Sequence, residues 1–211
     1  VTYFVDILQK LSKLTVEKEA ELTEINPLVI LNDGSMVALD GKIMTDDNSN
    51  FRHGELAKYR EQTKLEERAE KSGFSLVELD GNIAVVGNGA GLVMSTFDML
   101  ADNGGKPACF LDVGGGATEK SVYEALTLIS KMKKVKAILV NLYGGIVKTT
   151  IVASAFIKAY DNKLIDLPVY ARLMGAESDK SKEMLKDTKT KMFTSVEQAI
   201  NGIVIEVTKT G

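Results

Sequence analysis

Apolar side chains follow different spacings in the first part of the chain and in the rest of it. In residues 2–14 they recur every three or four positions, a spacing that predicts an amphipathic helix. The apolar residues 28–31, the turn-forming sequence Asn-Asp-Gly-Ser and a returning apolar run to residue 43 predict a β-hairpin. Residues 44–80 are polar and irregular, apart from a charged stretch at 56–71 that is typical of a helix.

From residue 82 onward, short apolar strands that end in glycine alternate with helical segments. Strands that alternate with helices form βαβ units around a mainly parallel sheet. Five such strands predict an α/β fold of the flavodoxin-like, doubly wound class, in which ligands bind outside the carboxyl ends of the strands. Thr118 is expected to cap one of the helices. The expected strands lie within 82–91, 107–118, 136–147, 167–176 and 191–194, and the expected helices within 91–105, 118–135, 148–163, 177–187 and from 196 onward.

Three of these strands run into glycine-rich loops that open helices. The loops contain Gly87-Asn88-Gly89-Ala90-Gly91, Gly114-Gly115-Gly116 and Gly144-Gly145. Glycine permits positive φ and close backbone approach, and the free N–H groups of a first helical turn attract anions. One such loop is explained equally well by tight packing of helix on sheet, and the first is only a weak sign of a dinucleotide. Three loops at one sheet edge predict a shared anionic ligand, either a carboxylate or a phosphate.

The hairpin carries a different chemistry. Glu24 and Asn26 alternate along its first strand and Asp40 lies on the partner strand, so all three side chains can point to one side. Carboxylate and amide oxygens suit Mg²⁺, which takes few protein ligands and several from phosphate and water. From spacing alone, a solvent-exposed acidic strand face is the simpler interpretation.

Composition excludes several classes of protein. With 45% hydrophobic and 26% charged residues the chain is of ordinary globular type, and its net charge of −3 gives no sign of nucleic-acid binding. No apolar run is long enough to span a membrane, so no membrane association is expected. The single cysteine, Cys109, excludes an intrachain disulfide and indicates a reducing compartment. Its apolar strand predicts a small buried hydrophobic residue.

Charge is unevenly distributed along the chain. Residues 1–70 hold 9 basic and 14 acidic residues, whereas the remainder holds 17 and 15. The sequence also starts without methionine, inside the pattern of a predicted helix. We therefore expect two segments of different origin, in a chain cut from a longer protein.

Five motifs, in order and with consistent gaps, resemble the β subunits of succinyl-CoA synthetase (succinate–CoA ligase). The resemblance implies that residues 1–50 are the C-terminal part of an ATP-grasp domain, 51–77 a connector, and 78–211 a flavodoxin-like CoA-ligase-type domain. The motifs are EINPLVIL (24–31), LDGKI (39–43), LDGNIAVVGNGAGLVMSTFDML (79–100), FLDVGGGAT (110–118) and VKAILVNLYGGIV (135–147).

This resemblance implies part of a ligase that converts succinate, CoA and ATP or GTP into succinyl-CoA, nucleoside diphosphate and phosphate. A phosphohistidine of the α subunit carries the phosphoryl group in this family. We therefore expect an α-subunit partner, in a heterodimer or a dimer of heterodimers, in the prokaryotic cytoplasm or the mitochondrial matrix. Most of the nucleotide site is expected outside this chain. His53 does not match the phosphohistidine motif and is expected to be a surface residue.

Carried over by position, the resemblance assigns roles in the hairpin. Asn26 and Asp40 match the Mg²⁺ ligands, and Glu24 matches the acidic residue that contacts the phosphohistidine. A carboxylate there can orient an imidazole through its N–H group. The resemblance thus favours a metal site over a merely solvated strand face.

The same comparison assigns roles in the glycine loops. Asn88 and the triplet Gly145-Ile146-Val147 match substrate-binding positions, and the helix after this triplet points its N-terminus at the phosphohistidine. The other loop residues are expected to form anion loops that shape the same pocket; they are Gly114, Gly115, Gly116 and Gly144.

Two segments depart from the family pattern. After Gly-Gly-Ile-Val the family has Arg, a small residue and Asp, whereas this chain has Lys148, Thr149 and Thr150. The family's Arg-Leu-Glu-Gly-Asn-Asn stretch keeps its arginine as Arg172 but loses the acid and both asparagines in 174–177. A related acyl-CoA ligase, such as one that uses malate, and a non-catalytic docking module therefore stay open as alternatives.

Overall fold

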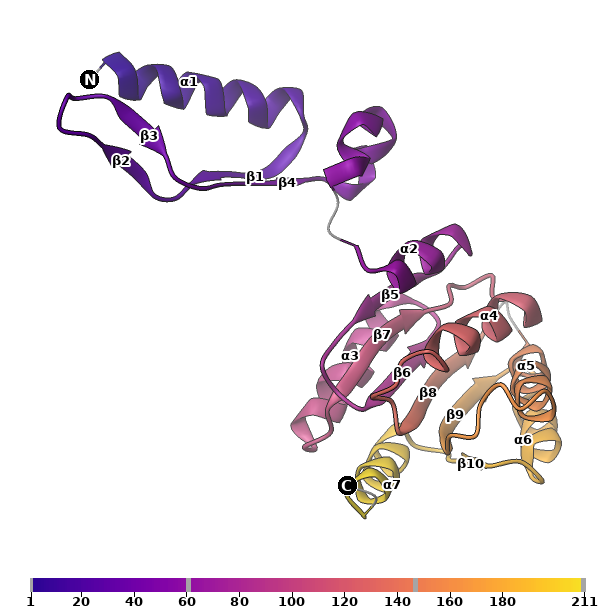
Figure 1. The fold of residues 1–211 in the computed structure, drawn as a ribbon. Helices are drawn as coiled ribbons and strands as arrows, with labels where there is room; N and C mark the ends of the chain where they lie inside the picture. The colour runs from indigo at the N-terminus through magenta and orange to yellow at the C-terminus, as the bar shows by residue number, and fades with distance from the viewer. Residues whose placement is uncertain (1, 60–61, 146–147, 210–211) are drawn as a thin grey trace. The chain divides into compact units, whose positions relative to one another are not determined.

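The computed structural model describes residues 2–59, 62–145 and 148–209. The chain divides into two compact units, residues 1–61 and residues 62–211 (Figure 1). Each unit has its own architecture.

The first unit combines one helix with two small antiparallel ladders. Strand β1 pairs with β4, and β2 pairs with β3. The predicted hairpin is therefore confirmed, but its returning strand is two strands, because Leu39 and Asp40 separate β3 from β4. The elements are α1 (Thr2–Glu17), β1 (Ala20–Ile25), β2 (Leu28–Ile30), β3 (Met36–Ala38), β4 (Gly41–Thr45) and the 3₁₀ helices η1 (Asp47–Arg52) and η2 (Gly54–Tyr59).

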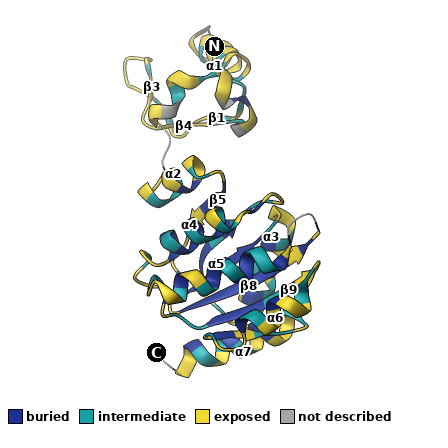
Figure 2. Ribbon diagram, turned by 90° about the vertical axis from the view of Figure 1, so that its right-hand side faces the viewer, coloured by how far each residue is buried: buried dark blue, intermediate teal, exposed yellow. Residues whose placement is uncertain are grey.

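Little apolar surface is buried in this first unit. Among its described side chains only Ser49 is buried, whereas Val16 and Ile30 are 75% and 66% exposed. Its ribbon is accordingly teal and yellow in Figure 2. Since burial of apolar area is the main stabilising contribution to folding, α1 and the ladders gain little from contacts within the unit.

The second unit is a six-stranded α/β sheet flanked by helices. Its strands are β5 (Ser75–Glu78), β6 (Ile83–Gly87), β7 (Pro107–Asp112), β8 (Ala137–Gly144), β9 (Val169–Gly175) and β10 (Thr190–Met192). Its helices are α2 (Lys64–Lys71), α3 (Ala90–Asp102), α4 (Glu119–Ile129), α5 (Thr149–Asp161), α6 (Ser178–Leu185) and α7 (Val196–Lys209).

Strand order confirms the predicted flavodoxin-like topology. The order is β10-β9-β8-β6-β7-β5, and all pairs are parallel except β5 with β7. After β7 the chain crosses to the other side of β6, so β6 and β8 flank the topological switch point at which doubly wound folds bind ligands. The register aligns Gly87 with Asp112 on one side and with Asn141 on the other, so the three glycine loops leave one sheet edge.

Both faces of this sheet are covered. Alternation along the strands sends Ala84 and Val86 to the face packed by α2, α4, α5 and α6, and Ile83 and Val85 to the face packed by α3 and α7. The central strands β6 and β8 are almost wholly buried, and the middle of the sheet is accordingly dark blue in Figure 2. Parallel strands buried on both faces read as continuous apolar runs, which is why their positions are readable from sequence.

Local signals set several helix starts, and two local predictions were wrong. Thr118 caps α4 as predicted, in a capping box with Ser121. The charged helix expected at 56–71 instead begins at Lys64, because Thr63 forms a capping box with Glu66. Ser75–Glu78, expected to be irregular, forms the antiparallel edge strand β5.

Candidate functional site

The first group of predicted site residues meets where the two ladders of the first unit join. Glu24 lies in β1, whereas Asn26 follows that strand and Asp40 precedes β4. Asn26 thus lies one residue beyond the strand expected to hold it, but the expectation that the three side chains point to one side is confirmed. The ladder continues across the gap through the main chain, since the Asn26 N–H donates to the Asp40 carbonyl at 3.2 Å. All three side chains line one pocket of about 230 Å³, with Gly41 and Lys42.

The donor set in this pocket fits a hard cation. The Asn26 Nδ2 donates to Glu24 Oε1 at 3.0 Å, so the amide oxygen is the atom of Asn26 free to bind a cation. Asp40 Oδ1 accepts from the Gly41 N–H at 2.8 Å. Within the described residues, no three His, Cys, Asp or Glu side chains form a metal-binding group. One amide and one or two carboxylates suit Mg²⁺, which keeps most of its ligands from water and phosphate.

A second group lies at the carboxyl ends of β6 and β8, in the other unit. Asn88 follows β6, and its carboxamide bonds the main chain of Tyr143 in β8: Nδ2 donates to the carbonyl oxygen, and Oδ1 accepts from the N–H, both at 2.9 Å. The side chain predicted to bind substrate therefore joins the two strands at the switch point. These bonds fix the loop, and they leave Asn88 a second Nδ2 hydrogen and a second Oδ1 lone pair for a ligand.

Asp112, at the end of β7, binds main-chain N–H groups of two of the glycine loops. Its Oδ1 accepts from the Gly89 N–H at 2.7 Å and from the Gly114 N–H at 2.8 Å. One internal carboxylate thus ties the first glycine loop to the second and uses one amide of each. Gly115 and Gly116 are exposed beyond it, with open space around their Cα atoms.

The third loop leads from β8 into α5. Gly144 closes β8 and is buried, and Gly145 follows it exposed to solvent. Ile146 and Val147, the other predicted substrate-binding positions, lie outside the described residues. Helix α5 begins at Thr149, whose N–H and hydroxyl both donate to the Ala176 carbonyl, at 3.1 and 2.9 Å.

A buried polar relay beside the switch point was not predicted. Arg172 Nη1 donates to Asn141 Oδ1 at 3.0 Å, and Asn141 Nδ2 donates to Thr96 Oγ1 at 2.7 Å. Asn141 and Thr96 are buried, so each must find a partner to avoid a desolvation cost. The signal available in the sequence was a lone asparagine inside the apolar run Ala-Ile-Leu-Val-Asn-Leu.

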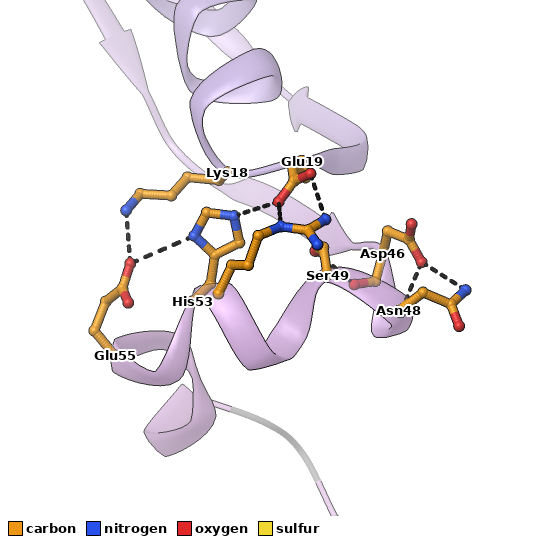
Figure 3. A network of polar contacts seen from close by, with 8 residues as sticks. Lys18, Glu19, Asp46, Asn48, Ser49, His53 and Glu55 are labelled. Carbon is orange, nitrogen blue, oxygen red and sulfur yellow. Dashed lines mark hydrogen bonds and ion pairs between the residues drawn. The ribbon is translucent and has the colours of Figure 1, made fainter.

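His53 was expected at the surface, and that expectation was wrong. Only 12% of its side chain is exposed, and its Nε2 lies 2.9 Å from Glu19 Oε2 (Figure 3). Arg52 donates to both oxygens of Glu19, at 2.8 and 2.6 Å. These bonds hold the pKa of Glu19 at about 2. His53 is thus a member of an ion-pair network within the first unit.

Cys109 is fully buried in β7, as predicted for a small hydrophobic residue. Burial raises the pKa of its thiol to about 12. At neutral pH the nucleophilic thiolate is therefore absent, which excludes Cys109 from covalent chemistry at the site.

A family model described as CoA-ligase matches residues 86–202. The chain is 43% identical to the β subunit of an ADP-forming succinate–CoA ligase of Deinococcus radiodurans, covering 98% of this chain and 55% of that protein. It is 44% identical to the β subunit of a GDP-forming succinate–CoA ligase of Thermus thermophilus, covering 90% and 51%. The chain thus spans about half the length of these relatives.

Solved structures share the fold. The ATP citrate lyase of Methanothrix soehngenii, solved with citrate and coenzyme A, matches with a TM-score of 0.70 and 15% identity, over 95% of this chain and 58% of that one. Identity this low supports the fold and no more. Within the described residues, no helix has the length and apolar content needed to cross a membrane.

Proposed function

Because this chain belongs to the CoA-ligase family, we propose that it forms part of the β subunit of a succinate–CoA ligase. The reaction joins succinate to CoA at the expense of ATP or GTP, in complex with an α-type subunit that carries the phosphohistidine. The observation that carries this proposal is that the match to succinate–CoA ligase β subunits extends over both units. We propose that the assembly is a heterodimer or a dimer of heterodimers. The proposed compartment is the prokaryotic cytoplasm or the mitochondrial matrix.

In the first unit, Asn26 and Asp40 would hold Mg²⁺ in the pocket that they line with Glu24. The ion supplies charge neutralisation for nucleotide phosphates when bound. Exposed apolar side chains on α1 and the ladders support the proposal that residues 1–50 are one edge of a larger ATP-grasp domain, because such faces are normally covered.

Glu24 would act on the phosphohistidine of the partner. Its carboxylate accepts one bond from Asn26, which fixes its orientation and leaves Oε2 to accept from an imidazole N–H. That contact would favour the tautomer whose other nitrogen is free for the phosphoryl group and would stabilise positive charge on the ring. Glu24 is exposed, as a residue that meets a ring from another chain must be.

In the second unit, substrate would bind at the carboxyl edge between β6 and β8. The N-terminus of α5 there bears partial positive charge, which attracts the carboxylate of an acid or a phosphoryl group. Asn88 would act by holding the loop after β6 on Tyr143, and Gly145, which is exposed with open space beside it, leaves room for close backbone approach. The loops are joined through Asp112, so the edge is organised before a ligand arrives.

The test uses the natural full-length chain, produced with its α-type partner. We expect CoA-thioester formation that requires succinate, Mg²⁺ and ATP or GTP, with malate a weaker acid substrate, and no turnover by the β chain alone. Turnover by the β chain alone, or preference for another acid, would contradict this assignment.

Two variants locate the metal site. Asp40→Asn keeps the size of the side chain but removes a charge, so the Mg²⁺ concentration for half-maximal rate should rise about tenfold or more. The matched control is Asp33→Asn, at an exposed turn in the same unit, which should leave the Mg²⁺ concentration for half-maximal rate unchanged.

A further inference from the structure

The two segments that depart from the family pattern meet in space. Lys148, Thr149 and Thr150 open α5, and Ala176 and Glu177 lead from β9 into α6. The Glu177 carboxylate bonds both residues that flank Thr149: Oε1 lies 2.7 Å from Lys148 Nζ, and Oε2 accepts from the Thr150 hydroxyl at 2.6 Å. Side chains 27 positions apart in the chain thus join the start of α5 to the turn before α6.

Two buried hydroxyl groups also join the start of α5 to the turn before α6. Thr149 and Ser181 are both fully buried, and Ser181 Oγ lies 2.7 Å from Thr149 Oγ1 and 3.0 Å from the Glu177 carbonyl. The Ala176 N–H donates to the Gly144 carbonyl at 2.9 Å. The start of α5 is therefore bound on one side by the turn that precedes α6.

Backbone geometry at this turn is unusual. Glu177 has φ +65°, a left-handed conformation that residues other than glycine, asparagine and aspartate seldom adopt. Gly175 has φ +101°, and a Cβ there would lie 2.2 Å from the Gly144 carbonyl oxygen. Residues held in such conformations are retained where the surrounding contacts over-determine them, and they concentrate at functional sites.

The ion pair between Lys148 and Glu177 persists at neutral pH. The Lys148 ammonium, with the Thr150 hydroxyl, lowers the pKa of Glu177, and Glu177 in turn raises the pKa of Lys148. Both groups are therefore charged together. Glu177 holds the Lys148 ammonium, and the Thr149 N–H already donates to the Ala176 carbonyl, so an anion here would be attracted mainly by the partial positive charge at the N-terminus of α5.

We propose that Glu177 is a positioning residue: through Lys148 and Thr150 it fixes the first turn of α5 against the turn before α6. The inference rests on the proposed function in one respect, that the N-terminus of α5 faces the acid substrate. Glu177 itself does not touch the reacting atoms.

Kinetics of the full-length complex give the first test. Glu177→Ala and Thr150→Val should each raise KM for the acid substrate about tenfold, with KM for CoA unchanged. Thr150→Ser keeps the hydroxyl and should behave as wild type. The charge swap Lys148→Glu with Glu177→Lys should recover part of the loss. Asp80→Ala, which breaks an exposed 2.9 Å ion pair with Lys134, is the matched control and should change neither constant.

Hydrogen exchange gives a second test that does not depend on turnover. Amides 149–152 should exchange about tenfold faster in Glu177→Ala than in wild type, while the first turn of α3 stays unchanged. If wild type has no ligase activity but this difference appears, the proposed function fails and the positioning role stands. Unchanged exchange at 149–152, or unchanged KM for the acid in an active complex, would overturn the positioning role.

Discussion

The carboxamide of Asn88 makes two hydrogen bonds to the main chain of Tyr143: Nδ2 donates to the carbonyl oxygen and Oδ1 accepts from the N–H, each at 2.9 Å. A side chain in the loop after β6 thereby completes the hydrogen bonding of β8 at its exposed end. An amide is the only side-chain group of this length that offers one donor and one acceptor side by side. The identity of residue 88 is thus constrained by the protein itself before any ligand is considered.

Asn88→Asp should therefore destabilise the second unit. Aspartate keeps the acceptor, but places a carboxylate oxygen against the Tyr143 carbonyl, so we expect a loss of about 1–2 kcal/mol in the free energy of unfolding. Guanidinium denaturation followed by circular dichroism measures it. Asn201→Asp, at an exposed position on α7, is the matched control and should stay within about 0.5 kcal/mol of wild type. Equal stability of both variants would contradict the pairing.

Gly87 and Gly91 make a second matched pair. A Cβ at Gly87 would lie 2.7 Å from the Asn141 carbonyl oxygen and 2.7 Å from Val93 Cγ2, whereas Gly91 has open space. Gly87→Ala should cost about 1–3 kcal/mol of stability, because β6 and β8 must separate locally. Gly91→Ala, within α3, should stabilise by about 0.5–1 kcal/mol. Guanidinium denaturation measures both changes in the free energy of unfolding. Wild-type stability of Gly87→Ala would contradict the close approach of Gly87 to Asn141 and Val93.

Glu19 should titrate near pH 2 in the folded chain. Its pKa lies below the ordinary 4.5 mainly because the Arg52 guanidinium bonds the carboxylate, with a contribution from His53. A lowered pKa means that the carboxylate stabilises the folded first unit above pH 4.5, and that this contribution is lost as pH falls from 4.5 through about 2. Carbon-detected NMR of the side-chain carboxyl measures the titration.

Arg52→Ala tests the cause of that shift. Without the guanidinium, the pKa of Glu19 should rise toward 4.5. Lys58→Ala removes a cation from η2 that is paired with the Tyr59 ring, and is the matched control, since it should leave the Glu19 titration in place. If the pKa of Glu19 is the same in Arg52→Ala as in wild type, the bonds to Glu19 drawn in Figure 3 are absent in solution.

Cys109 should resist thiol reagents while the chain is folded. Its side chain is fully buried and its pKa is raised to about 12, so both access and thiolate are lacking at neutral pH. N-ethylmaleimide should label the folded chain slowly and the guanidinium-unfolded chain fully, as read by intact mass. Rapid labelling of the folded chain would mean that β7 is accessible to solvent.

Local chemistry made much of the second unit predictable from sequence. Apolar runs marked β6, β7, β8 and β9 because strands buried on both faces carry little polar content. Thr118 marked the start of α4 because a cap acts on amides only three residues away. Glycines after the strands marked the loops of the candidate site for the same reason, since backbone freedom is a property of the residue itself.

Tertiary structure decided which groups those loops leave for a ligand. Asp112 binds Gly89 across 23 positions, Asn88 binds Tyr143 across 55, and Glu177 binds Thr150 across 27. His53 reaches Glu19 across 34 positions and so lies inside a network rather than on the surface. Such partners depend on strand order and crossover, which bring distant residues to one edge. Spacing along the chain predicts which residues can bind an anion or a metal, whereas only the fold determines which of their donors and acceptors are already bound within the protein.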